Sequence, residues 1–180
     1  MLEDKRLIWR LKRGDSEALR LIYEKYKDGL LSIAASLLHD SYAAEDVLHD
    51  VFVSFAAGVG QLELRGSLRR YLIACIINRV RDKFRKSKHQ VVELDEAEMI
   101  GSSLDEPEQV IMFSEESQSL ANALSQLPLE QRETIILHLT GGMKFKEIAN
   151  MQGLSISTVQ GRYRYGLNKL RTIVDGELKK

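Results

Sequence analysis

The sequence contains a single cysteine, Cys75, and only two prolines, Pro107 and Pro128, among its 180 residues. One cysteine excludes an internal disulfide, and its place on an apolar helical face favours a buried, inert thiol. The scarcity of proline, together with many helix-forming residues, predicts an all-α protein. No apolar run is long enough to cross a membrane, and the opening stretch MLEDKRLIWRLKRGD lacks the apolar segment of a signal peptide. We therefore expect a soluble intracellular protein without membrane insertion.

The sequence also lacks the usual marks of catalysis. The four histidines are dispersed, and none has the spacing of a metal ligand: His39, His49, His89 and His138. No glycine-rich phosphate loop and no nucleophile motif is present. Asp46, His49 and Asp50 share one helical turn and could hold a metal, although a face for docking a partner is the favoured interpretation. We expect no enzymatic activity from this chain alone and no cofactor.

Charge is segregated along the chain although the totals cancel, at 26 basic and 26 acidic residues. Residues 1–88 hold 17 basic against 12 acidic residues, and residues 121–180 hold nine against five. Residues 89–120 hold nine acidic residues and neither lysine nor arginine. Two mildly basic blocks joined by an acidic connector predict two modules that bind a polyanion and a linker that avoids DNA.

Helical periodicity covers most of the chain. Apolar residues recur every three or four positions in the ranges 2–12, 16–39, 41–57, 67–88, 107–127 and 129–139. In the fourth range, Phe84 is expected to face inward. Glycines at 58, 60 and 66 predict a flexible loop, and the aperiodic acidic residues 89–106 predict a linker. We expect an all-α fold of two helical domains, residues 1–88 and 107–180, joined by an acidic linker at residues 89–106.

Residues 144–171 have the pattern of a helix-turn-helix. A short helix at 144–152 is followed by Gly153, which suits the left-handed turn position, and Ser155 or Ser157 can cap a second helix. The side of the second helix opposite its apolar stripe carries Gln160, Arg162, Arg164, Asn168, Lys169 and Arg171. Arginine and glutamine pair with base edges, and the other cations can hold phosphates. A helical hairpin with an ordinary solvated basic face is the alternative, but turn, cap and basic face together favour DNA binding.

Two earlier helices carry further candidate surfaces. In the range 41–57 the acidic positions around His49 fall outside the apolar stripe, and this face suits partner docking or plain solvation equally well. The range 67–88 carries a dense basic surface relieved only by Asp82: Arg69, Arg70, Arg79, Arg81, Lys83, Arg85, Lys86 and Lys88. With Tyr71 and a glycine loop nearby, this surface suits phosphates close to unpaired bases.

Four strings resemble, in order, parts of the extracytoplasmic-function group of bacterial sigma factors within the sigma-70 family. AEDVLHDVF (residues 44–52) resembles its core-polymerase-binding helix, and GSLRRYLIACIINRVRDKFRK (66–86) its minus-ten helix. LSQLPLEQRETIILHL (124–139) resembles the start of its C-terminal domain. FKEIANMQGLSISTVQGRYRYGLNKLR (145–171) resembles its minus-thirty-five helix-turn-helix.

The resemblance implies a factor that binds core RNA polymerase, directs it to promoters and helps to open promoter DNA, with an anti-sigma factor as a further possible partner. Core polymerase would meet Glu45, Asp46, His49, Asp50 and Phe52. The minus-ten element would meet Gln61, Arg65, Tyr71, Asn78, Arg79, Asp82 and Arg85, with a flipped base received by the loop at 60–66. The minus-thirty-five element would meet Thr158, Gln160, Gly161, Arg162, Arg164, Tyr165 and Lys169.

Some positions depart from the group's pattern, and one rival function remains open. His49 stands where glutamine is usual, and Gly166 where alanine is commoner. Gly161 and Gly166 each weaken a recognition helix by about 1 kcal/mol unless the backbone must come close to DNA. The rival is a helix-turn-helix regulator that works without polymerase, for which we would expect tight operator binding by the protein alone.

Overall fold

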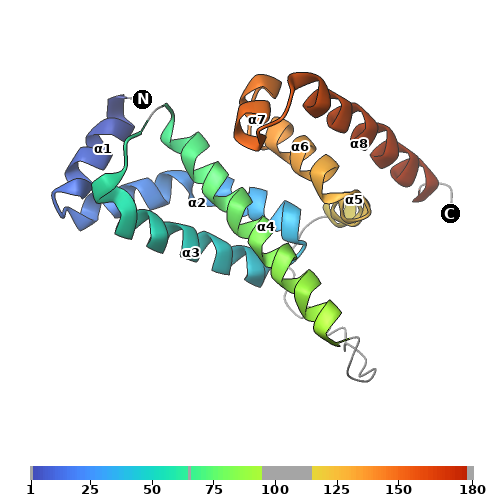
Figure 1. Ribbon diagram of the computed structural model, residues 1–180, viewed down its shortest axis with the longest axis horizontal. Coiled ribbons are helices and arrows are strands. Elements are labelled where there is room, and N and C mark those ends of the chain that lie inside the picture. Colours follow the sequence, from blue (N-terminus) through green and yellow to red (C-terminus); the bar gives the residue numbers. More distant parts are fainter. Residues whose placement is uncertain (1, 65, 95–114, 178–180) are drawn as a thin grey trace.

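The computed structural model describes residues 2–64, 66–94 and 115–177, and these residues form helices and connecting turns without a strand (Figure 1). The first group of helices is α1 (Leu2–Lys12), α2 (Ser16–Leu38), α3 (Ser41–Gly58), the short 3-10 helix η1 (Val59–Gln61) and α4 (Leu68–Leu94). The second group is α5 (Glu115–Ser125), α6 (Leu129–Leu139), α7 (Phe145–Gln152) and α8 (Ile156–Glu177). We call these two groups the N-terminal and the C-terminal region.

Side-chain caps determine where several helices begin. The Asp15 carboxylate accepts a hydrogen bond from the Glu17 amide at 3.0 Å and caps α2. The Asp40 carboxylate accepts from the Ala43 amide at 2.9 Å and caps α3. Each cap satisfies an amide that the helix itself leaves unpaired, which contributes about 1 kcal/mol. Helices α2 and α3 therefore begin at residues 16 and 41, the starts predicted from the periodicity.

The N-terminal region is built around α2, which packs against α1, α3 and α4. Its centre is made of fully or nearly fully buried aliphatic and aromatic side chains: Ile22, Ile33, Val47, Phe55, Leu72 and Ile76. Phe52 lies beside them and meets the Tyr23 ring edge-on, with centroids 4.9 Å apart. The outer end of α4 projects beyond the other helices of this region (Figure 1).

The C-terminal region is built around the contact of α6 with α8. Gly166 of α8 lies so close to α6 that an added Cβ would be 2.9 Å from Ile135 Cδ1 and 3.1 Å from Gln131 Cβ. The two glycines of the recognition helix therefore differ, since a Cβ at Gly161 would meet nothing within 4 Å. Gly166 is therefore needed for the close packing of α8 against α6, and not for a close approach of the backbone to DNA.

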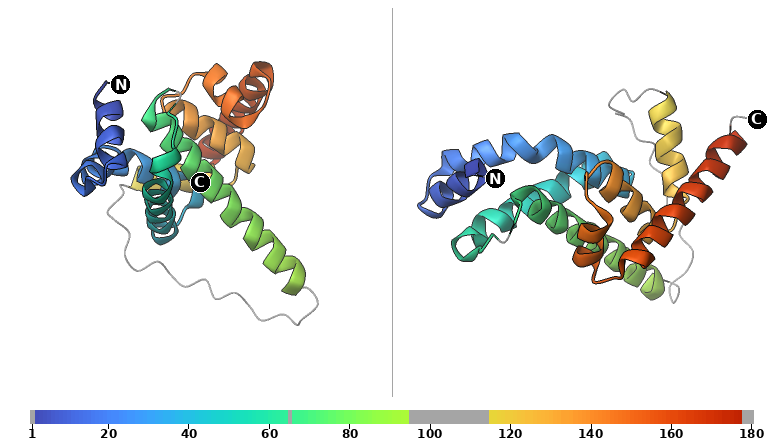
Figure 2. Two further views of the ribbon diagram at one scale, coloured as in Figure 1. Left: turned by 60° about the vertical axis from the view of Figure 1, so that its left-hand side comes forward. Right: turned by 90° about the horizontal axis from the view of Figure 1, so that it is seen from above.

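The two regions pack against each other through α6 and α7 on one side and α2 and α4 on the other (Figure 2). Arg132 of α6 is 8% exposed and donates to the Leu37 carbonyl at the end of α2, at 2.8 Å. Its other terminal nitrogen donates to the carbonyls of Ser125 and Leu127. Burial lowers the pKa of this guanidinium below its usual value.

Three sequence-based expectations about elements need correction or lie beyond the description. Helix α4 reaches Leu94 rather than ending at residue 88, because no glycine or proline follows that would stop it. Phe84, expected to face inward, is instead 37% exposed. The helix start expected at residue 107 lies outside the described residues, and the domain boundaries stay a prediction.

Candidate partner-binding and nucleic-acid interfaces

Helices α7 and α8 form the expected helix-turn-helix. Gly153 ends α7 in the left-handed conformation with φ 66°, and the Leu154 amide donates to the Ala149 carbonyl at 3.0 Å. The Ser155 hydroxyl accepts from the Thr158 amide at 3.1 Å, which makes Ser155 the cap of α8. Val159 is completely buried and fixes α8 by its inner face. Gly153 is the turn residue predicted from the sequence, and Ser155 is the one of the two cap candidates that the structure uses.

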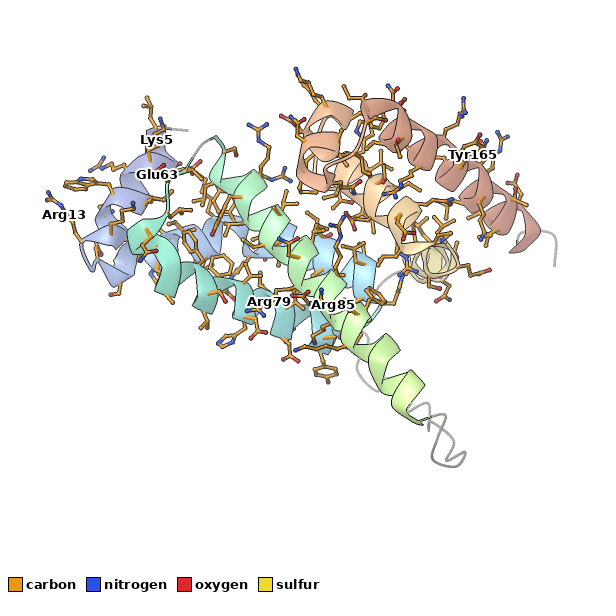
Figure 3. The ribbon with its side chains drawn as sticks, in the orientation of Figure 1. Lys5, Arg13, Glu63, Arg79, Arg85 and Tyr165 are labelled. Carbon is orange, nitrogen blue, oxygen red and sulfur yellow. The ribbon has the colours of Figure 1, made fainter. Side chains whose placement is uncertain are left out.

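The outer face of α8 presents most of the residues predicted to read the minus-thirty-five element. Exposed members of the set are Thr158, Gln160, Arg164, Tyr165 and Lys169, while Gly161 and Arg162 are half-buried. Tyr165 is 61% exposed and lies on this outer face (Figure 3). Within the described residues, none of the three cations of this set has a carboxylate partner, so all three are available to phosphates or base edges.

The residues predicted for the minus-ten element are only partly brought together. Asn78, Arg79 and Arg85 are exposed on α4, while Tyr71 and Asp82 are half-buried there (Figure 3). Arg79 donates to the Ser54 hydroxyl of α3 at 3.0 Å, and Arg85 pairs with Asp82 at 2.9 Å. Gln61 is exposed at the end of η1, and Arg65 lies outside the described residues.

Three other cations of α4 bind the C-terminal region, so they are not free members of the dense basic surface predicted from the sequence. Arg69 donates to the carbonyls of Thr140 and Gly141, and Arg70 pairs with Glu147. Arg81 makes a two-pronged contact with Glu133, at 3.0 and 2.6 Å. The Glu133 side chain is 4% exposed and also accepts from Gln152 at 2.6 Å. Helix periodicity could not reveal these contacts, because they depend on where the other region lies.

On α3, the predicted polymerase-binding residues Glu45, Asp46, His49 and Asp50 are all exposed. Two large apolar side chains on the same helix are also exposed, Tyr42 at 65% and Val53 at 55%. A hollow of about 290 Å³ between α2 and α3 is lined by Tyr23, Lys27, Asp28, Leu31, Glu45, Leu48 and His49. Phe52 is the exception, because it is 6% exposed and supports this face from within the core.

Two expectations about titratable groups can be compared with the structure. Cys75 is half-buried rather than fully buried as expected. Burial still raises the pKa of its thiol against the opposing effects of a Tyr71 hydrogen bond and the Arg79 charge, which fits the inert thiol expected from the sequence. In the part of the chain that the structure describes, no group of three or more potential metal ligands converges. Asp46, His49 and Asp50 therefore form an exposed acidic and imidazole face rather than a preformed metal site.

Comparisons with known proteins agree with this arrangement. Residues 22–90 match the family model of sigma-70 region 2, and residues 117–170 match that of sigma-70 region 4. The chain is similar to the RNA polymerase sigma-H factor of Pseudomonas aeruginosa, at 23% identity over 89% of this chain and 88% of that protein. It is also similar to the ECF RNA polymerase sigma factor SigW of Bacillus subtilis, at 23% identity over 93% and 94% of the two chains. Among solved structures, the sigma factor RpoE in complex with the anti-sigma factor NepR from Bartonella quintana has a TM-score of 0.70 at 23% identity, over 91% of this chain and 98% of that chain.

The match to sigma-70 region 2 followed by the match to region 4 places the chain in the class of DNA-binding transcription-initiation factors. The chain belongs to the sigma-70 family, and within it to the extracytoplasmic-function group of RNA polymerase sigma factors. It directs core polymerase to promoters and assists DNA melting, as members of this family do without catalysis of their own. Across the described ranges, none of the helices is long and apolar enough to serve as a membrane span.

Proposed function

We propose that the sigma-factor function of this chain is divided among three surfaces. The exposed side of α3 docks core RNA polymerase, α4 and the loop after η1 hold the melted minus-ten strand, and α8 reads the minus-thirty-five element. The observation that carries the proposal is that one chain presents three different surfaces. The helix-turn-helix has cations without a carboxylate partner on α8, α4 has exposed cations, and α3 has an acidic face. The acidic face favours this function over a regulator that works without polymerase, because it offers a docking surface for a protein partner.

The α3 face suits a protein partner rather than DNA. Glu45, Asp46 and Asp50 are negative and would repel phosphates, whereas Tyr42 and Val53 offer apolar area that a partner can bury. The hollow beside His49 gives the face a concave edge into which a partner side chain can fit. An anti-sigma factor that covered the same face would block polymerase binding, and the similar RpoE structure was solved with such a protein bound.

The minus-ten surface combines phosphate contacts with a place for an unpaired base. Arg79 and Arg85 are exposed cations on α4, and their present partners, a hydroxyl and a neighbouring carboxylate, are weak enough to be exchanged for phosphates. A base leaving the duplex costs a few kcal/mol, which pocket contacts and phosphate attraction must offset. Asn78 and Tyr71 are placed on the same helix to supply contacts to the base or sugar.

Upstream, α8 would enter the major groove by its first turns. Gln160 and Arg164 are one helical turn apart on the exposed face and can pair with adenine and guanine edges. Thr158 and Arg162 would then reach neighbouring phosphates. We infer further that the chain has no catalytic step of its own and acts in the bacterial cytoplasm, where core polymerase meets the promoter.

Run-off transcription with core polymerase on genomic promoter fragments tests the proposal directly. We expect transcripts only when this protein is added. Asp50→Arg should reduce co-purification with core polymerase at least tenfold, whereas Asp175→Arg, on the exposed end of α8, should not. Arg79→Ala with Arg85→Ala should leave polymerase binding unchanged but reduce the permanganate reactivity of promoter thymines. Tight binding of the free protein to a short palindrome, with no response to polymerase, would refute the proposal.

A further inference from the structure

His49 lies in the middle of the α3 face that we propose docks core polymerase. Glu45 and Asp46 precede it by four and three residues, and Val53 follows it by four, so all of them lie on its side of the helix. These side chains are exposed, Val53 at 55%. His49 also lines the hollow of about 290 Å³ between α2 and α3. A partner that covers this face must therefore cover the His49 imidazole as well.

The charged and titratable groups around His49 come from three helices: Glu45, Asp46 and Asp50 of α3, Tyr23, Lys27 and Asp28 of α2, and Lys83 of α4. Both cations have a carboxylate partner, because Lys27 pairs with Glu24 at 2.8 Å and Lys83 approaches Asp46 at 3.7 Å. Within residues 2–64, 66–94 and 115–177, the Glu45 and Asp50 side chains make neither a hydrogen bond nor an ion pair. The face therefore carries uncompensated negative charge, and a proton on His49 would offset part of it.

Negative charge on this face selects a basic surface as its partner. Contact with such a surface removes water from the imidazole and brings the partner's cations close to it. A neutral imidazole tolerates this environment, because it donates one hydrogen bond and accepts another. A protonated imidazole would be enclosed beside like charges, which lowers the affinity of the complex. The docked state therefore favours neutral His49, and docking must release a proton wherever the free side chain holds one.

We propose that His49 makes the docking of core polymerase on α3 sensitive to pH, with tight docking when the imidazole is neutral and weak docking when it is protonated. The inference rests on the proposed docking function of α3 and adds its regulation. The complex holds fewer protons than the free protein, so its affinity rises with pH and levels off once His49 is neutral in both states. Histidine changes charge between about pH 5 and pH 8, so a fall in pH through this range weakens docking.

Biolayer interferometry on immobilised core polymerase at pH 6.0 and pH 8.0, at one ionic strength, tests this role of His49. We expect the wild type to bind about fourfold to tenfold more weakly at pH 6.0, where most histidine side chains hold a proton. His49→Gln keeps a neutral donor and acceptor, so its two dissociation constants should agree within about twofold. His49→Lys is positive at both pH values and should bind at least about tenfold more weakly than His49→Gln at pH 8.0.

His39→Asn is the matched control, because it removes another histidine at the turn between α2 and α3. His39 has the left-handed conformation with φ 56°, which asparagine also adopts. Burial and the Arg132 charge lower the pKa of His39 to about 4, so its ring is neutral at both pH values. This variant should therefore keep the wild-type ratio of the two dissociation constants.

Three results would overturn the inference while leaving the proposed function intact. They are equal affinities of the wild type at the two pH values, tighter binding at pH 6.0, and a parallel loss of affinity in the wild type and His49→Gln. Binding of His49→Lys as tight as that of His49→Gln would also overturn it, because the face would then tolerate the added charge. Failure of the wild type to bind core polymerase at either pH would overturn the proposed function and this inference with it.

Discussion

The contact between Arg81 and Glu133 predicts a measurable energetic coupling between the two regions. Arg81 belongs to α4 and Glu133 to α6, and their side chains meet at 3.0 and 2.6 Å. The carboxylate is 4% exposed and the guanidinium 41%, so the pair is screened less than a surface pair but is not fully buried. Surface pairs contribute about 0.2–1 kcal/mol, and loss of one partner of a buried pair costs about 3–5 kcal/mol.

A double-mutant cycle with Arg81→Ala and Glu133→Ala measures the coupling energy between these two side chains. One hydrogen bond to a charged group contributes about 1.5–3 kcal/mol net, and the partial exposure of the guanidinium keeps the pair below the sum of two such bonds. We therefore expect a coupling energy of about 1–3 kcal/mol, measured by urea denaturation. Far-UV circular dichroism follows both regions, while the fluorescence of Trp9, the sole tryptophan, follows the N-terminal region.

Arg85 and Asp82 provide the matched control on the same helix. They form an i,i+3 pair at 2.9 Å with side chains 70% and 44% exposed, for which we expect no more than about 0.5 kcal/mol. The coupling at Arg81 and Glu133 should also persist at 0.5 M salt better than that of the control pair. A coupling no larger than that at Arg85 and Asp82 would show that the contact does not hold the regions together.

Two further predictions concern single positions. Gly166→Leu should lower the free energy of unfolding by at least about 1–3 kcal/mol, because the leucine side chain would overlap Ile135. Gly161→Ala should raise the free energy of unfolding by up to about 1 kcal/mol, because a Cβ there meets nothing. Equal effects of the two substitutions in thermal denaturation would contradict the close packing at Gly166. Burial alone would raise the pKa of Asp4, but hydrogen bonds from Lys25 and Tyr26 outweigh it and hold the pKa below 3.8. The ionised Asp4 therefore contributes to the stability of the fold above that pH, and this contribution is lost as the pH falls through the lowered pKa. Asp4→Asn should therefore cost about 1–3 kcal/mol at pH 7 and flatten the loss of stability below pH 4, and an unchanged acid denaturation profile would count against this reasoning.

The helices and the DNA-reading face were predictable from the sequence because their causes are local. Asp15 and Asp40 cap the helices that follow them, and Gly153 takes the left-handed turn. Each of these effects acts within four residues, so a pattern in the sequence contains all of it. The exposure of Gln160 and Arg164 follows in the same way, because burying Val159 fixes the rotation of α8.

The buried charges of α6 were not predictable, because their cause lies far away in the sequence. In the string EQRETIIL, Arg132 and Glu133 have the composition of a solvated helix face. In the structure they are 8% and 3% exposed, since α2 and α4 cover them. Their partners are Leu37 and Arg81, separated from them by 95 and 52 positions. Only the packing of the two regions distinguishes a solvated charge from a buried one here.

The same reasoning divides the cations of α4 by function. Residues two positions apart in a helix point about 200° apart, so Arg79 and Arg81 face nearly opposite directions. Arg81 turns toward α6, whereas Arg79 turns toward α3 and stays exposed. Phosphates can therefore reach Arg79 and Arg85 while the regions are packed together. Arg81 is 41% exposed, but Glu133 already neutralises its charge, so we expect DNA to bind first at Arg79 and Arg85 and more weakly at Arg81.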